Sequence, residues 1–338
     1  MNLLPNRKLA PKVLALVLPV VAGLSTQMIL SLVDTGMVGR LSDSEYTLAA
    51  MGIGNLATWA VVAIFSALAT GTHILVARNY GAMKYNECKN VLVNSLFIGI
   101  TLGIIAALLG VFLSPYIANF FAKDATVAGY AADYMQYRFL GLPFFLITVS
   151  YRGFYFGMGN TKVFMVSAAV TNVVNILLNY CLIFGEFGFP KMGISGAALA
   201  TSIATVVDAG IHFSAGYIIR KYRETFDIFT NLVLDKELIK TIIRISLPVS
   251  FQSVFILLGF LSFVAITGLV GTVQQAATQA IIATLFMSFL PSNGFGIASQ
   301  TLVGNAAGKK DFALARALAN ETAKLGLYYT TTLGLLFI

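Results

Sequence analysis

Runs of about 20 apolar residues recur along the whole chain and are separated by short polar connections. A helix of that length crosses a bilayer core of roughly 30 Å, and it satisfies its own backbone hydrogen bonds, which lipid cannot do. Only 11% of the residues are charged, whereas an ordinary soluble domain has roughly 25%. The sequence therefore predicts an all-α integral membrane protein.

The apolar runs predict nine membrane spans. Most of the connections between them are short. The longest connection is charged and partly amphipathic, and we interpret it as a linker with a surface helix. The predicted spans are 13–35, 47–75, 91–114, 129–156, 162–185, 193–219, 242–270, 275–302 and 318–338.

The formal net charge of +8 would suggest a nucleic-acid partner in a soluble protein. The positions of the charges argue against that. If the N-terminus is cytoplasmic, all but four of the 22 Lys and Arg residues fall on the cytoplasmic side, as the positive-inside rule requires. The four exceptions are Arg40, Lys123, Arg138 and Lys191. We therefore expect a multi-pass protein of the plasma membrane (a bacterial inner membrane), with a cytoplasmic N-terminus and no nucleic-acid partner.

The chain repeats itself. The sequence DTGMVG at 34–39 resembles ITGLVG at 266–271, and the stretch 73–89 resembles 300–316. The offset between the copies lies between 227 and 232 residues, so one half contains six spans. An even number of spans returns the chain to its starting side, which predicts parallel repeats.

We therefore expect a parallel two-lobe architecture, with six helices in the first lobe and about three in the second. The first lobe is predicted at 1–219, a cytoplasmic linker at 220–241 and a partial second lobe at 242–338. Because the second half stops in its third span, we expect a C-terminally truncated chain.

Polar residues form a stripe in the first span. Gln27, Ser31 and Asp34 follow at i, i+4 and i+7, so they share one helix face. Such groups are costly in lipid and by default face a cavity or the bundle interior. Asp34 is either a proton carrier or a solvated carboxylate near the outer end of the span. Pro19 removes a backbone hydrogen bond and offers a hinge.

The fifth span carries Asn172, Asn175 and Asn179 on one face. Amides donate and accept, so they could bind a carboxylate or a polar ligand, or they could pair across helices for packing alone. We interpret Asn172 as a packing residue. Both readings stay open for the other two.

The sixth span carries Thr201, Thr205, Asp208 and His212 at helical spacing. Asp208 and His212 form either a proton relay or a structural pair in which the two side chains hydrogen-bond to each other.

The fourth span carries Tyr134 and Tyr137 on one face, for packing or for a hydrogen-bond network. Near its outer end Asp133 and Arg138 could pair. We interpret His73, at the inner end of the second span, as a solvated loop residue.

Cys88 and Cys181 lack the paired spacing of a disulfide framework or a metal site. The sequence has no phosphate-binding loop and no nucleophile elbow. We expect neither an enzyme nor a cofactor, and the missing ATP motif favours coupling to an ion gradient.

Three segments resemble the multidrug and toxic compound extrusion (MATE) family. They are LVDTGMVGRL at 32–41, RFLGLPFFLITVSYRGFYFGMGNTK at 138–162 and NILLNYCLIFG at 175–185. The resemblance implies two six-helix lobes around a central cavity, and antiport of drugs against protons or sodium.

By position, the resemblance implies that Asp34 corresponds to the carboxylate of the family's first span and that Pro19 corresponds to the proline at which that span bends. Asn175 matches a polar residue of the family's fifth span, and Asn179 stands where some prokaryotic members have an aspartate. Ile256 stands where members with a second-lobe cation site have a glutamate, which argues against sodium there.

We therefore expect a monomeric, proton-coupled exporter of drugs or other amphipathic, often cationic, organic compounds. The alternatives are a lipid-linked oligosaccharide flippase of the same superfamily and a sodium-coupled drug antiporter. The near absence of basic residues inside the spans argues against the flippase. The residues predicted for proton coupling are Asp34, Asn175, Asn179, Tyr134, Tyr137 and Asp208, those for substrate binding are Gln27, Ser31, Thr201 and Thr205, and Pro19 is the predicted hinge.

Overall fold

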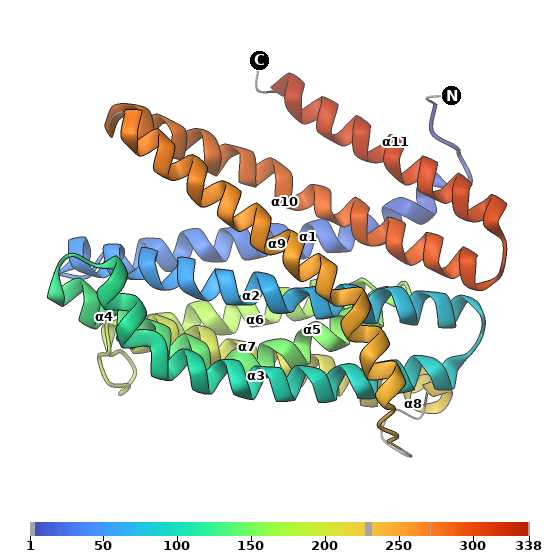
Figure 1. Ribbon diagram of the computed structural model, residues 1–338, viewed down its shortest axis with the longest axis horizontal. Helices are drawn as coiled ribbons and strands as arrows, with labels where there is room; N and C mark the ends of the chain where they lie inside the picture. Colours follow the sequence, from blue (N-terminus) through green and yellow to red (C-terminus); the bar gives the residue numbers. More distant parts are fainter. Residues whose placement is uncertain (1–3, 227–231, 271, 337–338) are drawn as a thin grey trace.

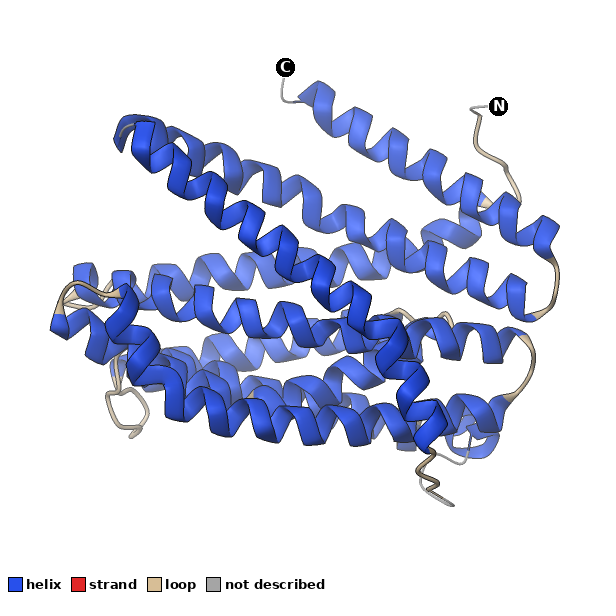
Figure 2. Ribbon diagram, in the orientation of Figure 1, coloured by secondary structure: helices blue, strands red, loops and turns tan. Residues whose placement is uncertain are grey.

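The computed structural model describes residues 4–226, 232–270 and 272–336. These residues form helices and connecting loops, with no strand among them (Figure 2). The helices are α1 (Ala10–Val38), α2 (Ser44–Gly81), α3 (Tyr85–Phe121), α4 (Ala125–Leu140), α5 (Leu142–Gly157), α6 (Lys162–Phe184), α7 (Ile194–Ile218), α8 (Arg220–Phe226), α9 (Lys236–Val270), α10 (Thr272–Gly308) and α11 (Phe312–Leu336).

Six helices within the described residues are long and apolar enough to cross a membrane, and the bent pair α4–α5 makes a seventh. The six are α1, α2, α3, α6, α7 and the part of α9 at Lys236–Val264. α10 and α11 coincide with the predicted eighth and ninth spans, but they do not meet this criterion over the residues described. The predicted all-α membrane class is confirmed.

The predicted fourth span is not one helix. α4 and α5 meet at an angle of 45°. Pro143 lies in the first turn of α5, and its missing N–H cannot continue the hydrogen-bond ladder of α4. The N–H of Gly141 bonds to the carbonyl of Arg138 rather than to that of Tyr137, and the hydroxyl of Ser202 in α7 donates to the Tyr137 carbonyl, at 2.6 Å. A Cβ on Gly141, at the break, would lie 2.9 Å from the same hydroxyl, so the bend and α7 fit closely.

The order and direction of the helices confirm the parallel two-lobe repeat. α1 and α9 both run away from the end of the bundle at which α2 joins α3, and α2 and α10 both return to it (Figure 1). We call α1–α7 the first lobe and α9–α11 the second. The two lobes approach each other at that end and diverge towards the other (Figure 1). α8 lies within the predicted linker, and α9 begins before the predicted linker boundary at 242.

The third helix of each lobe holds the segment that leads into the other lobe. In α3 the buried Asn94 accepts from the backbone N–H of Asp235 at 2.9 Å and donates to the carbonyl of Val233 at 3.0 Å. In α11 the buried Glu321 accepts from the backbone N–H of Asn6 at 2.7 Å. Asn94 and Glu321 are 227 residues apart, the offset of the repeat in this region. The repeat therefore generates two related clasps between the lobes.

The two lobes also meet where α2 crosses α10. A side chain on Gly81 would collide with the carbonyl of Asn305, and a side chain on Gly308 would collide with the carbonyl of Arg78. Each contact is the other shifted by the repeat offset of 227 residues. Glycine is required at both positions because backbone, which cannot rotate aside, occupies the space.

His73 lies at this crossing, and its interpretation as a solvated loop residue is wrong. The ring is buried, with its Nε2 atom 2.8 Å from the hydroxyl of Thr301 in α10. Thr301 in turn donates to the carbonyl of Phe156 at 2.9 Å. The second lobe covers this face of α2, and the position of α10 cannot be read from the sequence around His73.

We predict that Gly81→Leu lowers the stability of the protein, because the α2–α10 crossing must open to admit the side chain. Overpacking of this kind costs typically about 1–3 kcal/mol. The measurement is the thermal melting of the purified chain in detergent. Gly52→Leu, in the same helix, is the matched control, because no atom lies within 4 Å of a Cβ built there. Equal melting temperatures for the two variants would contradict the tight crossing.

Candidate functional site

A cavity of about 760 Å³ lies between the helices of the first lobe. It is bounded by side chains from α1, α2, α4, α5, α6 and α7. Polar and charged groups from all six helices therefore share one space. Its polar lining consists of Gln27, Ser31, Asp34, Asn55, Thr58, Trp59, Ser66, Tyr134, Arg138, Arg152, Thr171, Asn172, Asn175, Thr201, Thr205 and Asp208.

Asp34 is tied to α6 by a short hydrogen bond. The Nδ2 atom of Asn179 donates to Asp34 Oδ1 at 2.6 Å and to the Oδ1 atom of Asn175 at 2.9 Å. Asn179 is fully buried and lies behind the carboxylate rather than on the cavity wall. The structure thus brings together the carboxylate and the two amides that the sequence singled out, on helices distant in sequence.

The amide of Asn175 lies between Asp34, Asn179 and Thr201, within hydrogen-bond distance of all three. It therefore links the carboxylate of α1 to the polar groups of α6 and α7.

Tyr134 is anchored from α2, the helix in which sequence reasoning found no site residue. Its hydroxyl donates to Asn55 Oδ1 at 2.7 Å, and its ring packs where a side chain on Gly54 would be. Asn55 begins a stripe on α2 that continues through Thr58, Trp59 and Ser66. These residues have the helical spacing that identified the stripe on α1, so the same signal could have found them.

The four residues predicted to bind substrate all line the cavity. Thr201 and Thr205 donate their hydroxyl protons to carbonyls of their own helix, both at 2.9 Å, which leaves oxygen lone pairs for a ligand. Gln27 and Ser31 lie on the α1 wall with Asp34. The roles of these residues stay predictions.

Besides Asn179, two predicted residues lie away from the cavity wall. Tyr137 is not part of the lining, although its backbone carbonyl receives the Ser202 hydrogen bond at the α4–α5 bend. Pro19 is buried within α1, which continues as one helix on both sides of it. Asn172, interpreted from sequence as a packing residue, also lines the cavity, and its role stays a prediction.

Asp208 forms a second cluster at the cavity. Arg152 donates to Asp208 Oδ2 at 3.1 Å, with the side chains 20% and 9% exposed. His212 Nδ1 lies 3.2 Å from the other carboxylate oxygen and 2.9 Å from the backbone oxygen of Asp208. The Arg152 guanidinium also lies over the ring of Phe164, 4.7 Å from its centroid. The carboxylate is thus held by a permanent cation that the sequence did not associate with it.

Two arginines lie inside the bundle, where the sequence predicts almost no basic residue. Arg138 and Arg152 both line the cavity, so this prediction is wrong for them. Among the ion pairs of the described residues, none joins Arg138 to Asp133, which is exposed. The bend at Gly141 turns this part of α4 towards α7, which sequence spacing could not show.

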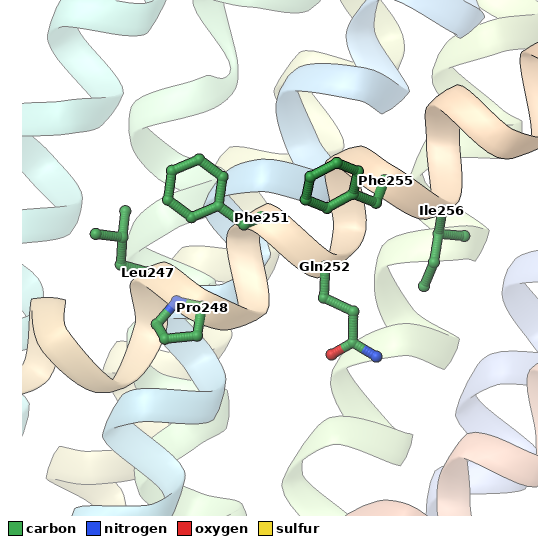
Figure 3. Close-up of a pocket in the computed structure, with 6 residues that line it drawn as sticks. All are labelled: Leu247, Pro248, Phe251, Gln252, Phe255 and Ile256. Carbon is green, nitrogen blue, oxygen red and sulfur yellow. The ribbon is translucent and has the colours of Figure 1, made fainter.

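A second hollow, of about 770 Å³, lies along α9 (Figure 3). The rings of Phe251 and Phe255 project from one side of the helix, and Gln252 projects from the other (Figure 3). The two hollows are similar in volume, but this one has no charged lining residue and only one helix. We therefore take the first-lobe cavity as the candidate site. The lining of the α9 hollow is Leu247, Pro248, Phe251, Gln252, Phe255 and Ile256.

Comparisons with known proteins agree on one family. The MatE family model matches residues 19–181 and 248–338. A probable multidrug resistance protein NorM of Thermotoga maritima is 30% identical over 99% of this chain and 72% of its own length. A protein of the same name from Listeria monocytogenes is 34% identical over 80% of this chain and 59% of its own length.

Solved structures with this fold include a multidrug resistance MATE family transporter of the MOP superfamily in an outward-facing conformation. It matches with a TM-score of 0.85 at 23% identity, over 96% of this chain and 70% of that chain. A MATE protein in the straight conformation matches with a TM-score of 0.83 at 24% identity, over 96% and 71%. The chain therefore covers about 70% of each of these structures.

Proposed function

This chain belongs to the MatE family, the multidrug and toxic compound extrusion transporters, and from this premise we propose that it exports amphipathic organic compounds in exchange for protons. Its relatives from Thermotoga maritima and Listeria monocytogenes are named as multidrug resistance proteins. Because the chain spans 72% and 59% of their lengths, the activity of a whole transporter is part of the proposal.

The carboxylate of Asp34 on the cavity wall is the observation that carries the proposal. It is half-buried, faces a space large enough for a drug-sized molecule, and is backed by the buried amide of Asn179 at 2.6 Å. When ionised, it attracts the cationic group of a substrate. When protonated, it loses that attraction and releases the substrate, so one group couples the two movements.

The hydrogen-bond partners of Asp34 support a proton rather than a sodium ion as the coupling species. A hard cation requires several oxygen ligands, whereas Asn179 presents its Nδ2 atom to the carboxylate. Asn175 and Asn179 then serve as the hydrogen-bond partners of the proton site, with Tyr134 beside it.

The two arginines favour a second candidate function, a flippase of lipid-linked oligosaccharides. A pyrophosphate group carries at least two negative charges, and basic side chains in a cavity would bind it. Arg152, however, is already paired with Asp208 at 3.1 Å, which leaves Arg138 as the one arginine of the lining without a carboxylate partner. We therefore place the drug exporter first.

In this proposal the chain acts as a monomer in the plasma membrane, with its N-terminus in the cytoplasm. The lysines and arginines of the connections support this orientation. Access to the cavity alternates as the two lobes rock, and Pro19 acts as a hinge in α1. The orientation can be tested by placing single cysteines in the connections between the helices and labelling them from outside in intact cells.

We expect an imposed pH gradient to drive the movement of a cationic dye such as ethidium across the membrane of proteoliposomes that contain the protein. A protonophore, which dissipates the gradient, should abolish the movement. A sodium gradient at equal pH should have no effect, because the proton site offers too few oxygen ligands. Movement driven by sodium alone would replace this proposal by the sodium-coupled antiporter.

A further inference from the structure

Arg138 is a charged residue of the cavity for which the proposed function has no use. Four ionisable aspartates and arginines line the cavity, and two of them, Arg152 and Asp208, form an ion pair. Arg138 has no carboxylate within 4.0 Å among the described residues, and its buried Nε atom has no hydrogen-bond partner. A guanidinium in this setting is a binding group without a bound partner.

The remaining charge of the cavity is Asp34, on a different helix. Arg138 in α4 acts electrostatically on Asp34, but the two side chains form no ion pair. Asp34 takes its short hydrogen bond from Asn179 instead. A negative group and a positive group from separate helices therefore line one cavity of about 760 Å³.

We propose that Arg138 is the anchor for an anionic group, a carboxylate, on the organic substrates of this cavity. A guanidinium matches a carboxylate by two parallel hydrogen bonds, a geometry that lysine cannot reproduce. Tyr134, one helical turn away on α4, and Trp59 of α2 line the same cavity and supply aromatic faces for a flat ring system. The inference rests on the proposed function and specifies which compounds the site prefers.

The charges of the cavity also predict how binding at Arg138 changes when Asp34 is neutralised. With Asp34 ionised, the four lining charges sum to zero; with Asp34 neutral, Arg138 is left without a counter-charge in the cavity. A neutral Asp34 therefore weakens the hold on a cation and strengthens the hold on a carboxylate. Cationic and carboxylate-bearing compounds should respond in opposite directions to its neutralisation.

Trp59 provides a direct readout of binding, because it is the single tryptophan of the chain and lines the cavity. The test titrates the purified chain, in nanodiscs of phosphatidylcholine, with two ligands and follows Trp59 fluorescence. The ligands are a rhodamine free acid and its methyl ester, which share one ring system. The acid carries a carboxylate and the ester is a cation only, so the comparison isolates the anionic group.

We expect the wild-type chain to bind the acid roughly tenfold or more tightly than the ester, as a hydrogen-bonded charge pair predicts. Arg138→Gln should remove this preference with little change in ester binding, and Arg138→Lys should keep only part of it. Asp34→Asn should widen the preference, because it leaves the cavity with a net positive charge. Arg40→Gln, an exposed arginine outside the cavity, is the matched control.

Equal binding of acid and ester by the wild type, or equal weakening of both by Arg138→Gln, would overturn the subsite and leave the proposed exporter standing. No response of Trp59 to either ligand would overturn the subsite together with the binding role of the cavity. Repeating the titration with phosphatidylglycerol in the nanodiscs tests whether Arg138 binds a lipid phosphate instead of a substrate carboxylate. Loss of the preference for the acid in these nanodiscs would identify lipid as the partner of Arg138 and overturn the proposed carboxylate anchor.

Discussion

Asp34→Asn is expected to abolish transport driven by a pH gradient in the whole transporter, while membrane insertion and the binding of a carboxylate-bearing ligand survive. The substitution keeps the shape and the hydrogen-bonding capacity of the side chain but removes the group that exchanges a proton. The bond from Asn179 can be kept, because the new amide oxygen accepts as the carboxylate did. Dye movement in proteoliposomes and Trp59 fluorescence measure the two properties separately.

Asn179→Ala is expected to have a milder effect than Asp34→Asn. It removes a hydrogen bond worth about 0.5–1.5 kcal/mol net, so it should slow pumping without abolishing it. If Asp34→Asn pumps at the wild-type rate while Asp208→Asn does not, the coupling site lies on α7. If neither substitution matters, proton coupling through the first lobe is wrong and sodium has to be tested.

Arg152→Met is expected to destabilise the first lobe by about 3–5 kcal/mol, because it leaves Asp208 as an uncompensated charge. The pair is only slightly exposed, and Arg152 also loses its contact with the ring of Phe164. Asp208→Asn should be destabilising for the converse reason. Thermal melting in detergent gives the two values, and Arg152→Met combined with Asp208→Asn completes a cycle.

The double variant Arg152→Met with Asp208→Leu distinguishes a structural pair from a proton relay. Replacing both partners removes the charge imbalance, so most of the lost stability should return. A proton relay through Asp208 predicts a different pattern, in which Asp208→Asn folds normally and fails only to pump. The short contact to Arg152 makes us expect the first pattern.

The sequence predicts those parts of the candidate site in which the residues lie on one face of a single helix. Gln27, Ser31 and Asp34 fall on one face of α1 by spacing alone, and all three line the cavity. The amides of α6 were found in the same way, and Asn179 does bond to Asp34. In both cases the cost of a polar group in lipid predicts the inward face without any knowledge of the neighbouring helices.

Partners across helices could not be read in this way. The sequence predicts Arg138 near the outer end of its span and counts Arg152 among the basic residues of the cytoplasmic side, yet both line the cavity. Asn55 accepts the hydrogen bond of the Tyr134 hydroxyl, and although its stripe on α2 has helical spacing, spacing could not show that it meets Tyr134. These contacts depend on the bend at Pro143 and on how α2, α4 and α7 approach one another.

The sequence by itself determined the helices, the lipid environment and the two-lobe repeat, because these depend on local properties. Hydrogen bonds within a helix join residues close in sequence, and a bilayer selects for long apolar runs. Only the tertiary structure decided that His73 is buried against Thr301 and that Arg152 pairs with Asp208. Such contacts join residues far apart in the chain, and they exist only once the packing of the helices has set which faces meet.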